Sequence, residues 1–186
     1  MPADGDDALM ARVRVRDQAA FNRLLARHLS AIHGYVLRLT HSHADADELA
    51  QETFLKVWAK ADTYRPGVVQ FSTWLHRIAH NLCMDELRRT RPEALENPDS
   101  HPSEASGPER DLAARESAAR LQHLLGTLPV SQRAALLLTE VQGLSSQQVA
   151  DIMNLGVHAV ESLLARARRT LRENMRDNSR QQVREP

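Results

Sequence analysis

The side chains best suited to binding a nucleic acid lie near the C-terminus of this sequence, in "SSQQVADIMNLGVHAVESLLARARR", residues 145–169. Arginines at helical spacing can bind DNA phosphates, and a carboxylate near the start of a helix can accept a hydrogen bond from cytosine N4. The side chains expected on the outer face of the second helix here are His158, Glu161, Ser162, Ala165, Arg166 and Arg169. They predict a helix that reads DNA bases, although Glu161 alone is equally consistent with a solvated surface residue.

The same stretch has the spacing of a helix-turn-helix. Ala150 is small enough for the two helices to approach closely, and Asn154 falls at the turn position that needs a left-handed backbone. Ser145 or Ser146 can cap the first helix. The apolar positions expected to be buried are Val149, Met153, Leu155, Val160 and Leu163. This pattern predicts a helix-turn-helix, with an ordinary helical hairpin as the alternative.

A second group of polar side chains lies on a helix predicted over residues 45–61. Its apolar residues recur at helical spacing, so the opposite face is expected to be exposed. That face carries Asp47, Glu48, Gln51, Glu52 and Leu55. Because its carboxylates repel DNA phosphates, this surface is better suited to a basic protein partner.

A third group combines aromatic, cationic and polar side chains, in the loop 62–70 and on a helix predicted over residues 72–89. Single-stranded DNA is bound by stacking on aromatic rings and by contacts to base edges. The candidates for such contacts are Tyr64, Arg65, Phe71, Trp74, His76, Arg77, His80, Asn81 and Arg88. The histidines, arginines and asparagine of the helix are expected to face outward. Taken singly, each residue is also consistent with ordinary surface.

A metal site is an alternative for part of this helix, because His76, His80 and Cys83 lie at i, i+4 and i+7. Against it, Cys83 is expected beside the core and both histidines on the DNA face. The sequence has no phosphate-binding glycine loop, nucleophile elbow or paired-carboxylate signature. We therefore predict no metal, no cofactor and no enzymatic activity.

The composition agrees with an intracellular protein. The 186 residues include 24 Lys and Arg and 24 Asp and Glu, so bulk charge does not indicate a nucleic-acid binder. A single cysteine cannot form an internal disulfide. The start "MPADGDD" lacks the features of a signal peptide, and no apolar run is long enough for a membrane span. We expect a soluble, cytoplasmic protein with no direct membrane insertion.

Periodicity predicts an all-α protein of two small helical domains. The helical pattern of the first half breaks near Arg16–Asp17 and at the loop 62–70. Residues 92–109 then hold four of the eight prolines, five acidic residues and no basic one, which is typical of a flexible tether. The predicted organisation is an N-terminal helical bundle (1–91), a flexible acidic linker (92–110) and a C-terminal helix-turn-helix domain (111–186).

The sequence resembles the sigma factors of bacterial RNA polymerase, and its compact two-domain form resembles their extracytoplasmic-function (ECF) class. The stretches that look like conserved regions two and four are "DADELAQETFLKVWAK", "FSTWLHRIAHNLCMDELRR" and "LPVSQRAALLLTEVQGLSSQQVADIMNLGVHAVESLLARARRTLRE". The resemblance covers most of residues 10–90 and 111–175.

The resemblance implies a role for each surface. The helix that carries Asp47 and Leu55 would bind the clamp helices of core RNA polymerase. The loop 63–71 and the helix 72–89 would recognise the −10 promoter element and hold a flipped non-template base, and the helix-turn-helix would read the −35 element. The acidic linker would run through the polymerase toward the RNA exit path. A specificity subunit of this kind borrows DNA affinity from the polymerase, which is consistent with the neutral charge.

The resemblance also implies regulation by an anti-sigma factor, usually membrane-anchored, and a monomer when free of partners. Two positions depart from the family pattern. Glu161 lies where many members have a basic residue, and Leu163 lies where Arg is common. We therefore expect a −35 sequence different from the familiar one.

The competing interpretation is a dimeric helix-turn-helix regulator with an N-terminal helical interaction domain. It predicts a dimerisation surface and binding to operators without polymerase. The block of aromatic and cationic residues over 64–89 argues against it, since an operator-binding regulator does not need to melt DNA.

Overall fold

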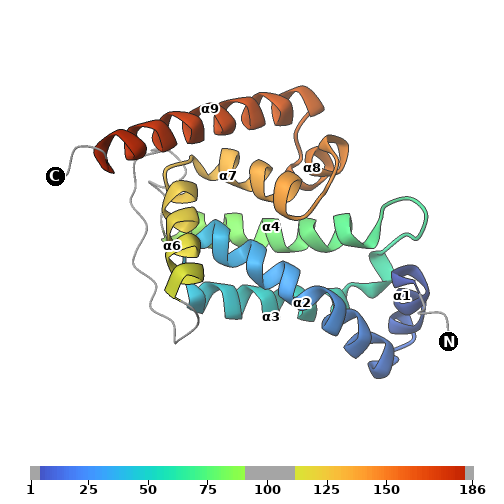
Figure 1. Cartoon of the computed structure of the whole chain (residues 1–186). Helices are drawn as coiled ribbons and strands as arrows, with labels where there is room; N and C mark the ends of the chain where they lie inside the picture. The colour runs from blue at the N-terminus through green and yellow to red at the C-terminus, as the bar shows by residue number, and fades with distance from the viewer. Residues whose placement is uncertain (1–4, 91–111, 183–186) are drawn as a thin grey trace.

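The computed structural model describes residues 5–90 and 112–182, which are helical with no β-strand among them (Figure 1). The first range contains α1 (Asp6–Arg14), α2 (Gln18–Thr40), α3 (His43–Ala59), the 3₁₀ turn η1 (Ala61–Thr63) and α4 (Phe71–Thr90). The second contains α6 (Leu112–Gly126), α7 (Val130–Leu136), the π-helical turn η2 (Leu137–Val141), α8 (Ser146–Met153) and α9 (Val157–Gln182). The all-α prediction is confirmed, and the predicted linker 92–110 lies outside the described residues.

Local sequence accounts for the breaks between the N-terminal helices. The Asp17 carboxylate caps α2 by accepting a hydrogen bond from the Ala20 backbone N–H at 3.1 Å. Arg16, just before it, has a left-handed φ of 65°, which confirms the predicted break. At its other end α2 stops at His41, left-handed with φ 58°, and Ser42 then caps α3.

The N-terminal unit, residues 5–90, is built on α2, α3 and α4, with α1 packed against α2 and η1 (Figure 1). Its core includes Leu24 and Ile32 of α2, Phe54 of α3 and Leu75 of α4, each at most 3% exposed. Burial of a side chain of this size contributes about 1.5–3 kcal/mol to folding. This core fixes the relative positions of the acidic face of α3 and the DNA-binding candidates on α4.

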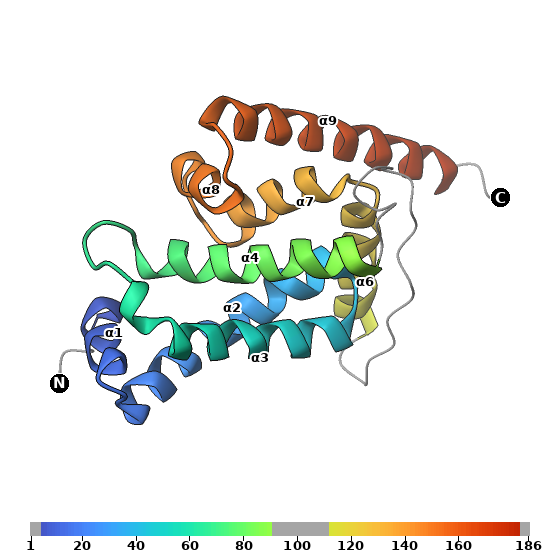
Figure 2. The same cartoon turned by 180° about the vertical axis from the view of Figure 1, so that it is seen from behind.

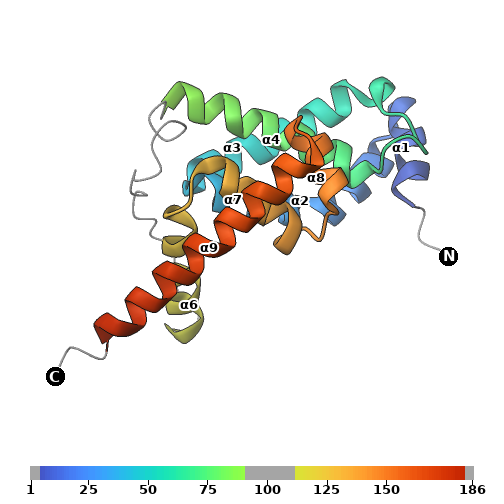
Figure 3. The same ribbon diagram turned by 90° about the horizontal axis from the view of Figure 1, so that it is seen from above.

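The C-terminal unit, residues 112–182, contains the predicted helix-turn-helix in α8 and α9. Ser145 caps α8 in a reciprocal capping box with Gln148, and Asn154 ends the helix in the left-handed region at φ 54°. Val149 and Ala150 are buried as predicted. Seen from above, the long helix α9 lies across α7 and α8, and it packs against both (Figure 3).

Three of the predicted core positions of the helix-turn-helix need correction. Met153, at the end of α8, is only partly buried. Leu155 is 41% exposed, because it follows the left-handed Asn154 in the turn and belongs to neither helix. Leu163 is only partly buried, whereas Leu164 is 5% exposed. Leu164 lies four residues after Val160 and so continues its buried stripe, while Leu163 lies at the edge of that stripe.

The two units contact each other. Helix α8 packs against α4, while α7 and η2 pack against α2, so α4 lies between α8 and α3 (Figure 2). Within residues 5–90 and 112–182, no helix has both the length and the apolar character that crossing a membrane requires.

Candidate polymerase and DNA interfaces

The acidic face of α3 is available at the surface, as predicted. Asp47, Glu48, Gln51 and Leu55 are exposed, and Glu52 is half-buried. Asp47 and Glu52 both have partners, but these are exposed ion pairs that are worth little individually. The Asp47 carboxylate lies 2.9 Å from His33 Nε2, and Glu52 lies 3.1 Å from the Lys56 ammonium one turn along the helix. Both carboxylates therefore remain accessible to a cationic partner.

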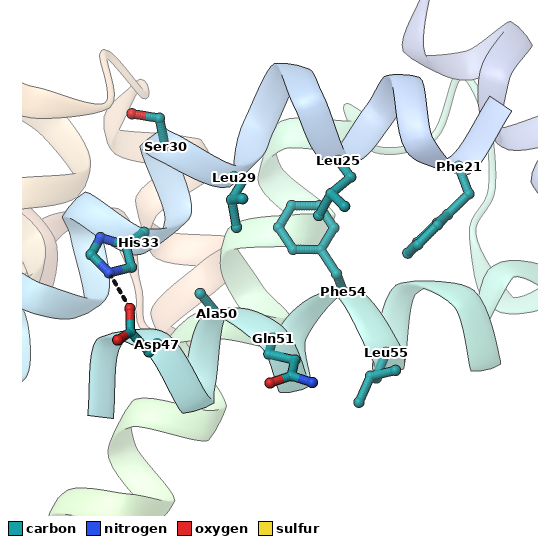
Figure 4. A pocket seen from close by; sticks show the side chains of 10 residues that line it. All are labelled: Phe21, Leu25, Leu29, Ser30, His33, Asp47, Ala50, Gln51, Phe54 and Leu55. Atoms are coloured by element: carbon teal, nitrogen blue, oxygen red, sulfur yellow. Dashed lines mark hydrogen bonds and ion pairs between the residues drawn. The ribbon is translucent and has the colours of Figure 1, made fainter. Parts of the chain in front are cut away.

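An apolar groove of about 540 Å³ lies directly beside this face, between α2 and α3 (Figure 4). We call it the α2–α3 groove. Its lining residues are Phe21, Leu25, Leu29, Ser30, His33, Asp47, Ala50, Gln51, Phe54 and Leu55. Leu29 and Leu55, on opposite walls, are 41% and 59% exposed. A groove with apolar walls and acidic residues at its edge fits an amphipathic helix that carries basic side chains.

The contribution of α2 to this groove was not among the sequence predictions. The available signal was the width of the apolar stripe of α2, which includes Leu25 and Leu29 as well as the fully buried Leu24. One helix face cannot bury all three positions against a single neighbour, so part of the stripe is left for another partner.

The predicted DNA-binding face of α4 divides into two groups in the structure. Arg65, Arg77, Asn81 and Arg88 are exposed, as expected. The others are buried: Tyr64, Phe71, Trp74, His76 and His80, all at most 5% exposed. The prediction that His76 and His80 face outward is therefore wrong for this structure.

Helix geometry explains this correction. His76, His80, Cys83 and Leu87 lie at i, i+4, i+7 and i+11, which is one continuous stripe, and all four are buried. Arg77, one position round the helix, lies on the exposed side. The sequence prediction assigns both stripes to one outer face, which is wider than the face that a helix packed on two sides can expose.

The buried aromatic residues form a cluster that holds the loop before α4. The ring of Tyr64 lies 5.8 Å from that of Phe71 and 5.3 Å from that of Trp74. The Tyr64 hydroxyl donates to the Asp7 carboxylate of α1 and lies 3.1 Å from the Val69 carbonyl oxygen. Burial, together with the Asp7 carboxylate, raises the pKa of Tyr64, so the hydroxyl remains a donor. The cluster thus positions Arg65 without contacting solvent itself.

His80 is held by a second buried tyrosine. The Tyr35 hydroxyl lies 2.9 Å from His80 Nδ1. Burial raises the pKa of Tyr35 well above its ordinary value and lowers the pKa of His80 to about 4. Tyr35 therefore stays protonated, and its hydroxyl can donate a hydrogen bond to the neutral imidazole of His80. Burial also raises the pKa of the Cys83 thiol to about 12, and no group of three or more potential metal ligands occurs among the described residues.

We expect this histidine to make folding sensitive to acid. The unfolded chain takes up a proton on His80 near its ordinary pKa of 6.5, whereas the folded chain resists it until about pH 4. The free energy of unfolding should therefore fall between these values, by roughly 3 kcal/mol at most. Burial lowers the pKa of His76 too, and this histidine acts in the same direction.

The measurement is urea unfolding at a series of pH values between 7 and 4. His80→Gln should flatten the dependence on pH, while the same change at the exposed His43 of α3 should leave it unaltered. Equal slopes in the wild type and in His80→Gln would assign the proton uptake to other groups.

The outer face of α9 presents the predicted DNA-contacting residues. His158, Glu161, Ser162, Ala165, Arg166 and Arg169 are all exposed. Near the start of the helix, His158 Nδ1 lies 3.2 Å from Glu161 Oε2, and the Ser162 hydroxyl donates to the His158 carbonyl at 2.8 Å. Arg168, further along, is paired with Glu140 at 2.6 Å. The face is therefore polar at its start and cationic beyond it.

Comparison with known proteins matches each of the two units to a conserved region of one protein family. Sigma-70 region 2 matches residues 24–93, and Sigma-70 region 4 matches residues 118–171. ECF RNA polymerase sigma factor SigE of Mycolicibacterium smegmatis is 35% identical over 88% of this chain, and the chain spans 65% of that protein. RNA polymerase sigma factor CnrH of Cupriavidus metallidurans is 33% identical over 91% of this chain and 94% of its own length.

Solved structures agree with these matches. CnrH in complex with the cytosolic domain of CnrY has a TM-score of 0.74 and 31% identity, covering 94% of this chain and 99% of that one. The sigma factor RpoE in complex with the anti-sigma factor NepR, from Bartonella quintana, has a TM-score of 0.68 and 27% identity, covering 84% and 96%. The chain belongs to the sigma-70 family of RNA polymerase sigma factors, in its ECF class.

Proposed function

We propose that this chain is a promoter-specificity subunit: it binds core RNA polymerase, directs it to promoters with −10 and −35 elements and helps to initiate transcription. The observation that carries the proposal is the presence of Sigma-70 regions 2 and 4, in that order, in one chain. Each region has an exposed polar surface suited to its partner. The subunit recognises DNA, and the polymerase supplies the chemistry. A dimeric operator-binding regulator has no use for region 2.

The direct test is reconstitution. The purified chain is mixed with core RNA polymerase, the complex is isolated by gel filtration, and run-off transcription is measured on promoters taken from the genome of origin. The expected result is a stoichiometric complex that starts at defined positions where core polymerase alone does not. Operator binding by a dimer, with no effect on polymerase, would support the competing regulator.

The proposed polymerase contact is the acidic face of α3 together with the α2–α3 groove. Its members are Asp47, Glu48, Gln51, Glu52 and Leu55, and the partner is the clamp region. Carboxylates at the edge steer a basic partner into place, and Leu55 supplies apolar area that is exposed in the free chain. The apolar contact is expected to contribute most of the affinity, because exposed ion pairs contribute little.

The proposed −10 surface is the exposed side of α4 with the loop before it. Arg65, Arg77, Asn81 and Arg88 are exposed, and in this proposal they would contact the DNA directly. Tyr64, Phe71, Trp74, His76 and His80, which are buried, act in this structure by positioning the loop and the helix. A flipped base would be held at the loop, where the polar and cationic side chains are accessible.

The proposed −35 surface is the start of α9, and Glu161 gives its sharpest test. A carboxylate repels phosphates, so its useful contact is to cytosine N4. Glu161→Ala should lower discrimination at one −35 cytosine by roughly 1–3 kcal/mol while leaving the other positions unchanged. Arg166→Ala or Arg169→Ala should instead weaken all promoters alike and reduce the salt dependence.

The measurement is transcription from promoters in which each −35 base is varied singly. Ser131→Ala, an exposed position at the start of α7, serves as a control. If Glu161→Ala changes the preference at no position, Glu161 is a surface residue and its neighbours read the sequence.

We further propose that an anti-sigma factor of the membrane-anchored type holds this cytoplasmic chain inactive, and that the chain is a monomer without partners. Two structural relatives are bound to protein partners, one to the cytosolic domain of CnrY and the other to the anti-sigma factor NepR. The exposed Leu55 and the α2–α3 groove offer a docking surface. A pull-down from uninduced cells should recover a stoichiometric partner besides polymerase, and failure to find one would contradict this regulation.

A further inference from the structure

The loop before α4 has a tip whose shape is set by its own sequence. Pro66 and Gly67 are the two central residues of a tight turn, and Gly67 has a left-handed φ of 77°. Across the turn, the Val68 backbone N–H donates to the Arg65 carbonyl at 3.3 Å. Proline followed by glycine is the residue pair that a type II turn favours. Since the turn is fixed locally, the orientation of the tip depends on how the base of the loop is held.

The base of the loop is closed by the hydroxyl of Tyr64, which lies between two acceptors. One acceptor is the Val69 carbonyl oxygen, 3.1 Å away at the other end of the loop, and the other is the Asp7 carboxylate of α1. A hydroxyl has one proton to donate, and a charged carboxylate is the stronger acceptor. The bond to Asp7 therefore holds the hydroxyl in its place beside Val69.

Helix α1, beside this loop, provides a firm support for Asp7 (Figure 2). Three of its apolar side chains are fully buried: Leu9, Met10 and Val13. The neighbouring carboxylate, Asp6, pairs with α2, where its oxygens lie 2.9 Å from Arg27 Nη1 and 2.8 Å from His28 Nε2. Two adjacent carboxylates thus have separate contacts, Asp6 with α2 and Asp7 with the loop.

We propose that Asp7 is a positioning residue for −10 recognition, which acts through the Tyr64 hydroxyl to orient the loop tip that carries Arg65 and Val68. The inference rests on the proposed function of this loop toward −10 DNA. Both tip side chains are exposed, Val68 by 83%. Recognition requires its groups to be held within about 0.5 Å of the productive geometry. A loop that has lost its anchor should therefore select the −10 base less well, rather than bind all promoters less well.

Asp7→Ala removes the anchor and leaves the buried side of α1 unchanged. Asp6→Ala is the matched control, because it removes the same charge one residue away and breaks the pairs with α2, yet keeps the bond between Asp7 and Tyr64. Asp7→Asn also removes the charge but keeps an acceptor oxygen for the Tyr64 hydroxyl. Tyr64→Phe removes the hydroxyl and keeps the ring in its cluster.

The experiment is run-off transcription by each variant with core RNA polymerase, on promoters in which every −10 base is varied singly. Asp7→Ala should reduce discrimination at one −10 position by roughly three- to tenfold, the effect of one hydrogen bond. Asp6→Ala should keep the wild-type preference, and Asp7→Asn should keep most of it. Tyr64→Phe should cause no further loss when it is added to Asp7→Ala, because both changes remove the same contact.

Urea unfolding of the same variants separates folding from selection, since an unfolded fraction lowers transcription from all promoters by one common factor. Wild-type preference in Asp7→Ala, an equal loss in Asp6→Ala, or a further loss on adding Tyr64→Phe would each overturn the positioning role while the proposed function stands. Failure of the wild type to form a transcribing holoenzyme, or to prefer any −10 base, would instead refute the proposed function, and the role of Asp7 with it.

Discussion

Reversing the charge of Asp47 and Glu52 together should abolish stable binding to core RNA polymerase. Both carboxylates lie on the accessible face of α3, one of them lining the α2–α3 groove. Two lysines there would face a basic partner, and such like-charge contacts cost several kcal/mol. The expected loss of affinity is on the order of 100-fold or more. Titration of the labelled chain with core polymerase measures it.

The fold should survive this double change. The double change removes only two exposed contacts, one between Asp47 and His33 and one between Glu52 and Lys56. The free energy of unfolding should therefore change by no more than about 1 kcal/mol. The matched control is Asp62→Lys with Asp151→Lys. It changes the net charge equally at exposed positions away from the groove. If both double variants lose affinity for core RNA polymerase to the same extent, the binding depends on long-range charge and not on this face.

A change in the groove itself tests the apolar part of the same contact. Leu55→Asp removes a side chain that is 59% exposed, so it costs the fold little, yet it places a charge where an apolar partner surface should pack. We expect weaker polymerase binding at unchanged stability. Normal binding by this variant would restrict the interface to the charged edge.

Sequence patterns predicted the surfaces of this chain better than its interior contacts. The exposed face of α9 and the acidic face of α3 follow from helical periodicity alone, and their exposure is confirmed for every residue except the half-buried Glu52. Asn154 and Ser145 were predictable because turns and caps depend on local backbone chemistry. Their roles toward DNA and polymerase remain predictions.

The missed features depend on contacts between distant segments. His76 and His80 are polar, so the sequence placed them outside, but Tyr35 lies 45 positions before His80 and supplies its buried partner. Arg133 is likewise buried because it reaches the Leu39 carbonyl, 94 positions away. A buried polar side chain is recognisable only once its partner is known, and one sequence does not reveal that pairing.

Trp74 provides the strongest test of this distinction between contacting DNA and positioning the residues that do. The sequence suggested a DNA contact, whereas the indole is 5% exposed and packs 5.3 Å from the Tyr64 ring and 6.1 Å from the Phe71 ring. Trp74→Ala should therefore lower the free energy of unfolding by about 3–5 kcal/mol. The loop that carries Arg65 would lose its support, and −10 recognition would fail as a consequence.

Urea unfolding of Trp74→Ala, Trp74→Phe and Arg77→Ala, each paired with open-complex formation on duplex promoters, separates the two roles. Trp74→Phe keeps a ring in the cluster and should retain most of the stability and the activity, since the cost of a core substitution follows the volume removed. Arg77 is exposed, so Arg77→Ala should weaken the open complex at nearly unchanged stability. Trp58→Ala, at a half-buried ring 5.1 Å from the Phe21 ring, should cost less stability than Trp74→Ala. If Trp74→Ala instead unfolds like the wild type and still fails to melt promoters, the indole leaves the cluster to contact DNA, and the positioning role is wrong.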